Sequence, residues 1–370
     1  MANLKLRNLN KTYSNGAEVV KNFSLDIEDK EFVVLLGPSG CGKSIVLRMI
    51  AGLEEIGLGE VWIEDQLVND VDTKDRKIAM LFQNYVLYPQ MTVYENMAFS
   101  LRLEKLSKGE IDKLVYDTAK LLCIEELLER KPKTLSSAQK QRVAIGRAII
   151  RNPKVFLMDE PLSNLDKKMH GQMYMEISKL HKKLGTTVVY VTHNQAEALS
   201  LGTKIVVMKE GSVQQVGSKE ELYNNPKNLF VASYVGSPQM NFIEATVQKD
   251  GDEVKLVFGS NKVQLPLEKS SILLKKGYEG KDIILGIRPE DIKEEIAFAE
   301  QAKDDVLEAT VKVVKVLETE VFLQLLLEEN EILVLTNPQT NVKEDESIHI
   351  TFDTSRIHIF DKDTEQAIVN

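Results

Sequence analysis

Three short apolar runs stand out along the first two thirds of the chain, and each of them ends in polar or charged residues. The runs are 32–36, 155–158 and 187–191. Their length and composition predict buried strands. Segments with apolar residues at helical spacing lie between them, such as the segment that ends at Gly52. Strands that alternate with helices predict an α/β fold, with a parallel sheet covered by helices on both faces.

The pattern changes twice along the chain. Residues from about 89 to 152 combine helical periodicity with many charges, which predicts a helical subdomain inserted into the α/β unit. Residues 1–30 show short strand-like stretches with turn signals. After Gly236 the apolar runs become rich in strand formers. We therefore expect two domains, 1–235 and 236–370, the second a small β-barrel of the oligosaccharide-binding type.

Composition and charge limit the kinds of partner. The chain has 370 residues with 43% hydrophobic content, enough for a large core, and a formal net charge of −9. A negative net charge argues against binding nucleic acid through bulk electrostatics. The chain has two cysteines, which favours a reducing compartment. The N-terminus lacks a long apolar core and no apolar stretch approaches about 18 residues, so we expect neither a signal peptide nor a membrane span.

A glycine-rich loop follows the first apolar run. Its pattern, G-x-x-x-x-G-K-S between a strand and a helix, predicts a phosphate-binding loop. Backbone N–H groups and a helix N-terminus would surround the phosphates, Lys43 would reach the β- and γ-phosphates, and Ser44 would bind Mg²⁺. A glycine-rich turn without a ligand is the alternative. The loop residues are Gly37, Pro38, Ser39, Gly40, Cys41, Gly42, Lys43 and Ser44.

Polar residues at the ends of the other two runs complete a candidate site. Asp159 and Glu160 follow the second run, and His193 follows the third after Thr192. Ligands of parallel sheets collect at the carboxyl ends of strands. We therefore expect Asp159 to hold Mg²⁺, Glu160 to act as the general base towards the attacking water, and His193 to meet the γ-phosphate. The alternative for the two acids is a solvated loop.

Together with further motifs, these residues resemble the ATP-binding subunit of an ABC transporter, and most closely the carbohydrate-importer branch. The resemblance implies that the Tyr13 ring stacks on adenine, and that Gln83 contacts both Mg²⁺ and the attacking water. It also implies that the segment 163–166 crosses a dimer interface. The additional motifs are Tyr13, Gln83, the signature segment Leu135-Ser136-Ser137-Ala138-Gln139, Ser163-Asn164-Leu165-Asp166, Gly236–Phe242 and Gly286–Glu290.

The signature segment departs from the family pattern Leu-Ser-Gly-Gly-Gln. Ser137 and Ala138 replace both glycines. In the family, Ser136 to Gln139 would contact the γ-phosphate bound by the other subunit. A methyl group at Ala138 would hinder close approach of the backbone, and restoring both glycines would then raise ATPase activity. Ile45 also replaces a hydroxyl residue of the nucleotide site.

The resemblance implies a homodimeric ATPase that binds ATP and Mg²⁺ and drives carbohydrate import. Its partners would be two integral membrane permease subunits, an extracellular sugar-binding protein acting indirectly, and a regulatory protein on the C-terminal domain. It would lie peripherally on the cytoplasmic face of the cell membrane. Three readings stay open: impaired turnover because of the signature segment, import of polyamines, metal ions or phosphonates, and a C-terminal domain that serves only for dimerisation.

Overall fold

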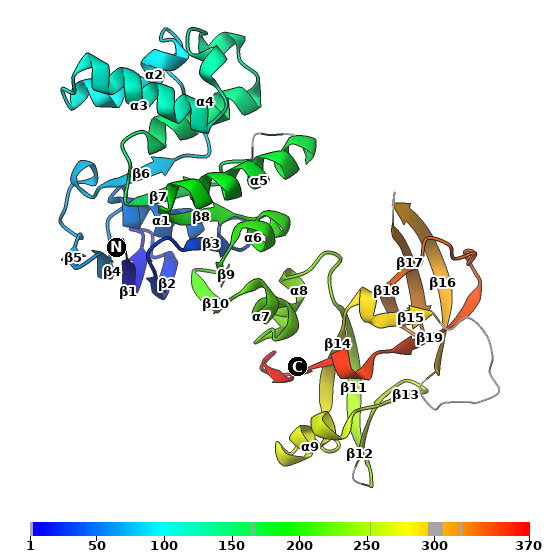
Figure 1. Cartoon of the computed structure of the whole chain (residues 1–370). Coiled ribbons are helices and arrows are strands. Elements are labelled where there is room, and N and C mark those ends of the chain that lie inside the picture. The colour runs from blue at the N-terminus through cyan, green and yellow to red at the C-terminus, as the bar shows by residue number, and fades with distance from the viewer. Residues whose placement is uncertain (1–2, 164, 166, 252, 295–305, 318–319) are drawn as a thin grey trace. The chain divides into compact units, whose positions relative to one another are not determined.

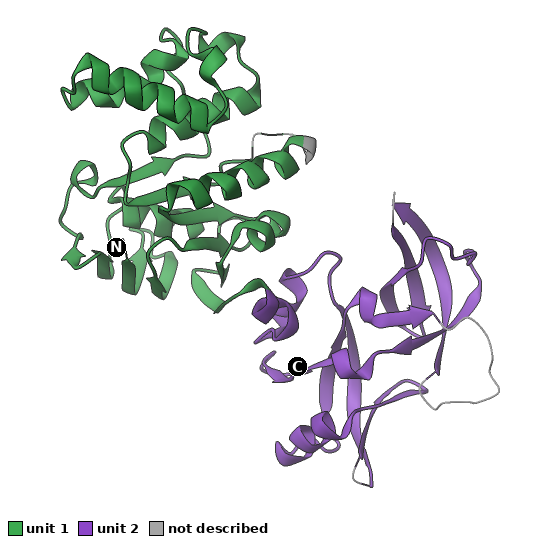
Figure 2. Ribbon diagram, viewed as in Figure 1, with its two compact units in different colours: residues 1–219 green, residues 220–370 purple. Residues whose placement is uncertain are grey.

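A computed structural model of the chain describes residues 3–163, 165, 167–251, 253–294, 306–317 and 320–370 (Figure 1). The chain divides into two compact units, Met1–Lys219 and Glu220–Asn370 (Figure 2). Each unit has its own cluster of buried apolar side chains. Two short helices between residues 219 and 234, which the sequence analysis assigned to the first domain, thus fall almost wholly in the second unit.

The first unit is built around a six-stranded sheet whose spatial order is β10-β9-β3-β8-β7-β6. The three predicted runs form β3, β7 and β8, and every residue of these strands is buried. Neighbouring strands from β9 to β6 are parallel, and only β10 is antiparallel. The predicted parallel sheet is therefore confirmed. Its strands are β3 (Phe32–Leu36), β6 (Ile78–Leu81), β7 (Val155–Asp159), β8 (Thr187–Thr192), β9 (Lys204–Lys209) and β10 (Ser212–Gly217).

A second, antiparallel sheet of order β2-β1-β4-β5 completes the β-structure of this unit. Along β1 and β2 buried residues alternate in part with exposed ones, as expected for a sheet that faces the core on one side. The apolar side chains of both sheets join one core cluster with the first helix. The strands are β1 (Leu4–Thr12), β2 (Glu18–Ile27), β4 (Leu58–Ile63) and β5 (Gln66–Leu67).

Helices cover the parallel sheet and form a separate group at one end of the unit. The predicted helical segment contains α2, α3 and α4, which lie together in Figure 1. Each of these three helices begins with a capping box, in which a Ser or Thr side chain and a Glu or Gln three residues later satisfy backbone N–H groups. The helices are α1 (Lys43–Ala51), α2 (Val93–Leu103), α3 (Lys108–Leu121), α4 (Ser137–Ile149), α5 (Lys167–Leu184) and α6 (Gln195–Leu201), with 3₁₀ turns at Thr73–Asp75, Glu125–Leu127 and Pro132–Thr134.

The second unit consists of two antiparallel sheets with orders β13-β12-β11-β14-β20-β21 and β15-β19-β16-β17-β18. Both sheets contribute to one apolar cluster. The strand-rich texture predicted after Gly236 is confirmed. The strands are β11 (Asn241–Asp250), β12 (Glu253–Phe258), β13 (Asn261–Gln264), β14 (Asp282–Ile287), β15 (Ile292–Glu294), β16 (Val306–Leu317), β17 (Glu320–Leu327), β18 (Asn330–Thr336), β19 (Ser347–Phe352), β20 (His358–Asp361) and β21 (Ala367–Val369).

Three short helices accompany these sheets: α7 (Lys219–Asn224), α8 (Leu229–Tyr234) and α9 (Leu267–Lys275), with 3₁₀ turns at Pro289–Asp291 and Thr354–Arg356. Among the helices of the described residues, none combines the length and the apolar character that a bilayer crossing requires.

Candidate active site

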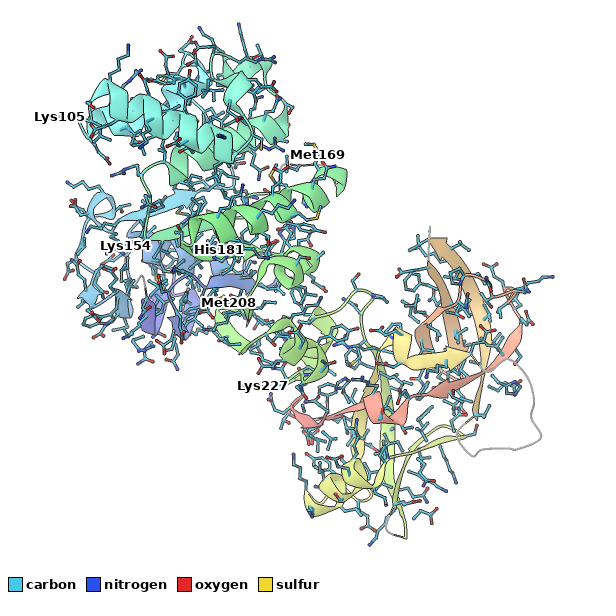
Figure 3. All side chains as sticks on the ribbon, in the orientation of Figure 1. Lys105, Lys154, Met169, His181, Met208 and Lys227 are labelled. Carbon is cyan, nitrogen blue, oxygen red and sulfur yellow. The ribbon has the colours of Figure 1, made fainter. Side chains whose placement is uncertain are left out.

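The glycine-rich loop joins β3 to α1, as the sequence predicted. The residue that precedes the helix, Gly42, has a φ of 99°, a conformation that side chains with a Cβ rarely adopt. A Cβ on Gly37 would lie 2.4 Å from the backbone oxygen of Met208, a residue labelled in Figure 3. Glycine is therefore required at both positions, by backbone conformation at Gly42 and by close packing at Gly37.

Lys43, the first residue of α1, extends back over the loop. Its Nζ atom donates hydrogen bonds to the backbone oxygens of Gly37 and Pro38, each at 2.8 Å. The residue is only 4% exposed. The ammonium group is thus held inside the curve of the loop, where the motif places it next to phosphate oxygens.

Ser44 and Asp159 meet between α1 and the end of β7. The Ser44 hydroxyl donates to Oδ1 of Asp159 at 2.5 Å, and an Arg48 nitrogen lies 3.9 Å from the other carboxylate oxygen. Asp159 is 4% exposed, and this burial raises the pKa of its carboxyl group, an effect that the Ser44 hydrogen bond and the Arg48 charge oppose. A second oxygen ligand therefore stands beside the Ser44 hydroxyl, as a magnesium site requires.

Glu160 lies at the centre of the predicted catalytic residues. Its Oε1 is 3.2 Å from Nδ1 of His193, and its Oε2 accepts a hydrogen bond from the Gln83 amide at 3.3 Å. The structure therefore brings together Gln83, Glu160 and His193, which come from three separate segments. Since Asp159 precedes Glu160 directly, the magnesium-binding and catalytic candidates share one edge of the sheet.

The backbone of Glu160 is in the left-handed region, with φ at 43°. A residue with a side chain adopts this conformation at a cost of about 1–2 kcal/mol, so surrounding contacts must hold it. The Glu160 N–H donates to the backbone oxygen of Val191 at 3.0 Å, and the Ser163 hydroxyl donates to the Glu160 carbonyl at 2.9 Å. Strain of this kind often accompanies catalytic groups, and the sequence pattern contained no sign of it.

The other residues of the loop have different surroundings. Ser39 and Gly40 are exposed, whereas the Ile45 side chain packs against the core of the unit. Cys41 is buried, with its Sγ 3.8 Å from Lys43 Nζ. A nearby cation and a helix start would favour a thiolate, but burial outweighs the Lys43 charge and raises the pKa of the Cys41 thiol. The structure therefore favours an unreactive thiol at this position.

Tyr13 and the signature segment lie elsewhere in the first unit. Tyr13 follows β1 and is 38% exposed, with Lys11 Nζ 5.7 Å from its ring centre. Ser136 caps α4, and its hydroxyl accepts from the Gln139 N–H. Ser137 is exposed but Ala138 is buried. In the part of the chain that the structure describes, no hydrogen bond or ion pair links this segment to the phosphate loop. Of the segment 163–166, Asn164 and Asp166 lie outside the described residues.

Two features of the site were not predicted. One is Arg48 beside Asp159, one helical turn beyond Ser44 and therefore on the same face of α1. The other is Glu197, a buried acid whose neighbours include His170 at 3.2 Å. His170 follows no buried strand, so the pattern that identified His193 does not identify it. For Glu197, the only sign in the sequence was an acidic residue in a helical segment, five positions after Thr192.

Comparison with known proteins identifies the family. A model described as "ABC transporter" matches residues 20–163, a "MalK OB fold domain" matches 236–292 and a "TOBE domain" matches 285–360. The chain is 48% identical to the oligosaccharides import ATP-binding protein MsmX of Bacillus subtilis, over the whole of both chains. The chain belongs to the ATP-binding proteins of ABC transporters. Its fold is therefore an ABC cassette followed by a domain of the oligosaccharide-binding type, and it is an ATPase.

Two other relatives agree with this assignment. The multiple sugar-binding transport ATP-binding protein MsmK of Streptococcus mutans is 47% identical, again over the whole of both chains. Among solved structures, the ATP-binding cassette MJ0796, described as a dimer bound to ADP and phosphate, is 36% identical with a TM-score of 0.52. It covers 58% of this chain and 98% of its own. The predicted α/β cassette is thus confirmed.

Proposed function

We propose that this ATPase drives carbohydrate import, with Gln83, Glu160 and His193 as its catalytic residues. The observation that carries the proposal is the convergence of these side chains beside the phosphate loop and Asp159. The sugar-import names of the two relatives, which match over their full lengths, support the substrate class. Among the residues that the structure describes, no feature favours import of polyamines, metal ions or phosphonates over carbohydrates.

The geometry supports a separate task for each of these residues. Glu160 accepts the proton of the attacking water, and its two oxygens are fixed by Gln83 on one side and His193 on the other. His193 is also positioned to donate to the γ-phosphate. Lys43 supplies positive charge inside the loop. Tyr13 stacks on adenine, and the loop residues Gly37, Ser39, Gly40, Cys41, Gly42 and Ile45 surround the phosphates. The signature residues Ser136, Ser137, Ala138 and Gln139 contact the nucleotide of a second subunit, Ala138 through its backbone because its side chain is buried.

The residues at this site fit Mg²⁺. Oxygen ligands about 2.0–2.1 Å from an octahedral ion lie about 2.9 Å from each other, close to the 2.5 Å that separates Ser44 Oγ from Asp159 Oδ1. The side-chain oxygen of Gln83 would supply a further ligand. When bound, the ion neutralises charge on the phosphates. Since only ionised Asp159 binds the cation well, Mg²⁺ binding should weaken as the pH falls.

We further propose the domain assignment and the partners. Residues 1–235 form the nucleotide-binding domain, with a helical subdomain at about 89–152, and residues 236–370 form the regulatory domain. Two copies of the chain pair and act on two integral membrane permease subunits, which receive the sugar from an extracellular binding protein. The chain then works peripherally at the cytoplasmic face of the membrane, and a regulatory protein binds the C-terminal domain.

The variant Glu160→Gln tests the site. It should keep ATP affinity and lose about 10²- to 10⁴-fold in hydrolysis, because the amide cannot accept the proton. Glu125→Gln, at an exposed acid in the helical subdomain, is the matched control and should behave as wild type. Hydrolysis by Glu160→Gln at near wild-type rate would refute the assignment. Import is tested by co-expression with the membrane subunits and measurement of sugar-stimulated ATPase activity.

A further inference from the structure

The chain segment that follows Glu160 is held by side chains from two helices. Gln141 on α4 is fully buried, and its amide donates to the Pro161 backbone oxygen at 3.0 Å. His170 on α5 lies with Nε2 3.1 Å from the Leu165 backbone oxygen. His170 is next to Met169, which is labelled in Figure 3. Pro161 and Leu165 are thus both held through their backbone oxygens.

The second ring nitrogen of His170 connects this segment to another part of the site. Its Nδ1 is 3.2 Å from Oε1 of Glu197, and the two side chains are 21% and 5% exposed. The other Glu197 oxygen accepts hydrogen bonds from the hydroxyls of Tyr190 at 2.8 Å and Thr192 at 2.9 Å. A buried carboxylate with these contacts is fixed on all sides.

Glu197 also belongs to the turn that carries the catalytic histidine. The Thr192 hydroxyl accepts from the Asn194 N–H at 2.9 Å, and the Asn194 side chain accepts from the Glu197 N–H at 3.3 Å. These contacts lie on both sides of His193 in the chain. The turn that presents His193 to Glu160 is therefore built on the same carboxylate that His170 contacts.

Hydrogen-bond chemistry makes the His170 ring more than a filler. A backbone oxygen and a carboxylate both act as acceptors, so both contacts are satisfied only when two protons are shared between the ring and its carboxylate partner. A side chain with a single donor or none leaves one of these two acceptors without its contact to residue 170, so one of the two ties is lost.

We propose that His170 and Glu197 form a positioning relay for hydrolysis: together they tie the segment after the general base to the turn that carries His193. Neither residue is placed against the reacting atoms. They act by fixing the geometry of Glu160 and His193, which lie 3.2 Å apart. The inference rests on the proposed hydrolytic site at Glu160.

Three variants test the relay in the assembled protein. His170→Leu removes both ring nitrogens at similar size and should lower kcat by about 10- to 100-fold, because small displacements of reacting groups cost rates of this order. The KM for ATP should stay within about twofold, since Lys43 and the loop are not touched. His170→Arg supplies several donors and should recover most of the loss. Met175→Leu, at an exposed methionine of the same helix, is the control and should leave both constants unchanged.

The outcomes separate a relay from a packing role. A lowered kcat in His170→Leu with recovery in His170→Arg supports the relay. Overturning results are an unchanged kcat in His170→Leu, or a loss that His170→Arg does not recover. Should His170→Leu fold poorly, Glu197→Gln keeps the size and one acceptor but removes the charge, and it should lower kcat in the same way. If Glu160→Gln retains hydrolysis, the assignment of the hydrolytic site fails. If Glu160→Gln loses hydrolysis but His170→Leu matches wild type, only the relay fails.

Discussion

Ala138→Gly is the sharpest test of how the altered signature segment works. The sequence suggested that the Ala138 methyl obstructs the phosphate of the opposite subunit. In the structure Ala138 is the second residue of α4 and is only 8% exposed within a single chain. Its methyl group therefore packs into the protein. The backbone at this position is helical, so no left-handed conformation demands glycine.

The cost of the substitution follows from these two facts. Glycine is about 1 kcal/mol less favourable than alanine within a helix, and somewhat less in the first turn. Removing a buried methyl group costs about 0.8 kcal/mol more. We expect a total near 1.5 kcal/mol, which for a unit of this size lowers Tm by about 3–6 °C.

Thermal unfolding of the purified chain and ATPase activity of the assembled protein measure the two effects. Ala138→Gly should lower Tm and leave kcat within about twofold of wild type. Ser137→Gly is the matched comparison, because Ser137 is exposed and any contact with a nucleotide would involve its side chain rather than that of Ala138. A rise in kcat of more than threefold in Ala138→Gly, without a loss in Tm, would refute the reasoning and restore the obstruction hypothesis.

Two further predictions concern single side chains. Lys43→Ala should weaken ATP binding in a nucleotide titration by tenfold or more, since a charge-assisted hydrogen bond contributes about 1.5–3 kcal/mol; an unchanged affinity would contradict the loop assignment. Burial lowers the pKa of His358 to about 4 from an unfolded value near 6.5, so its stabilising contribution is complete above about pH 6.5 and is lost as the pH falls towards 4. Urea unfolding of wild type and His358→Asn at about pH 6.5 and about pH 4 measures this effect. Between these pH values the free energy of unfolding should fall by about 3 kcal/mol less in His358→Asn than in wild type, and an identical pH dependence in the two proteins would exclude His358 as its origin.

Much of the site could be predicted because its chemistry lies in contiguous segments. The predicted site residues lie at or directly after the end of a buried strand, and local patterns identify such strands well. They are the loop 37–44, the pair Asp159-Glu160 and His193. Roles could be proposed for them because parallel strands present their carboxyl ends at one edge. The side chains that support them were harder to predict. Arg48 and Glu197 act through contacts that depend on how α1 and α6 pack, and no local pattern specifies such contacts.

The direction of the Ala138 side chain was missed for a related reason. Family resemblance indicates which residues are usual at a position, but the consequence of a substitution depends on which face of the helix the residue occupies. The Cys41 thiol is a similar case: charge and helix position favour a thiolate, whereas burial opposes it, and burial is a property of the folded chain. In both cases burial in the folded chain opposes an effect that the local sequence favours.

The order of the strands explains why the catalytic residues converge. Along the chain the strands appear as β3, β7 and β8, but in the sheet β8 lies between the other two. Leu36 pairs with Thr192, and Val191 pairs with Asp159. The residue after each strand therefore emerges at nearly the same level, with His193 between the phosphate loop and Glu160. A sheet ordered as in the sequence would place the acids next to the loop and His193 beyond them, where it could not lie between a phosphate and the general base. The topology of the sheet, rather than any single motif, thus brings the histidine to Glu160.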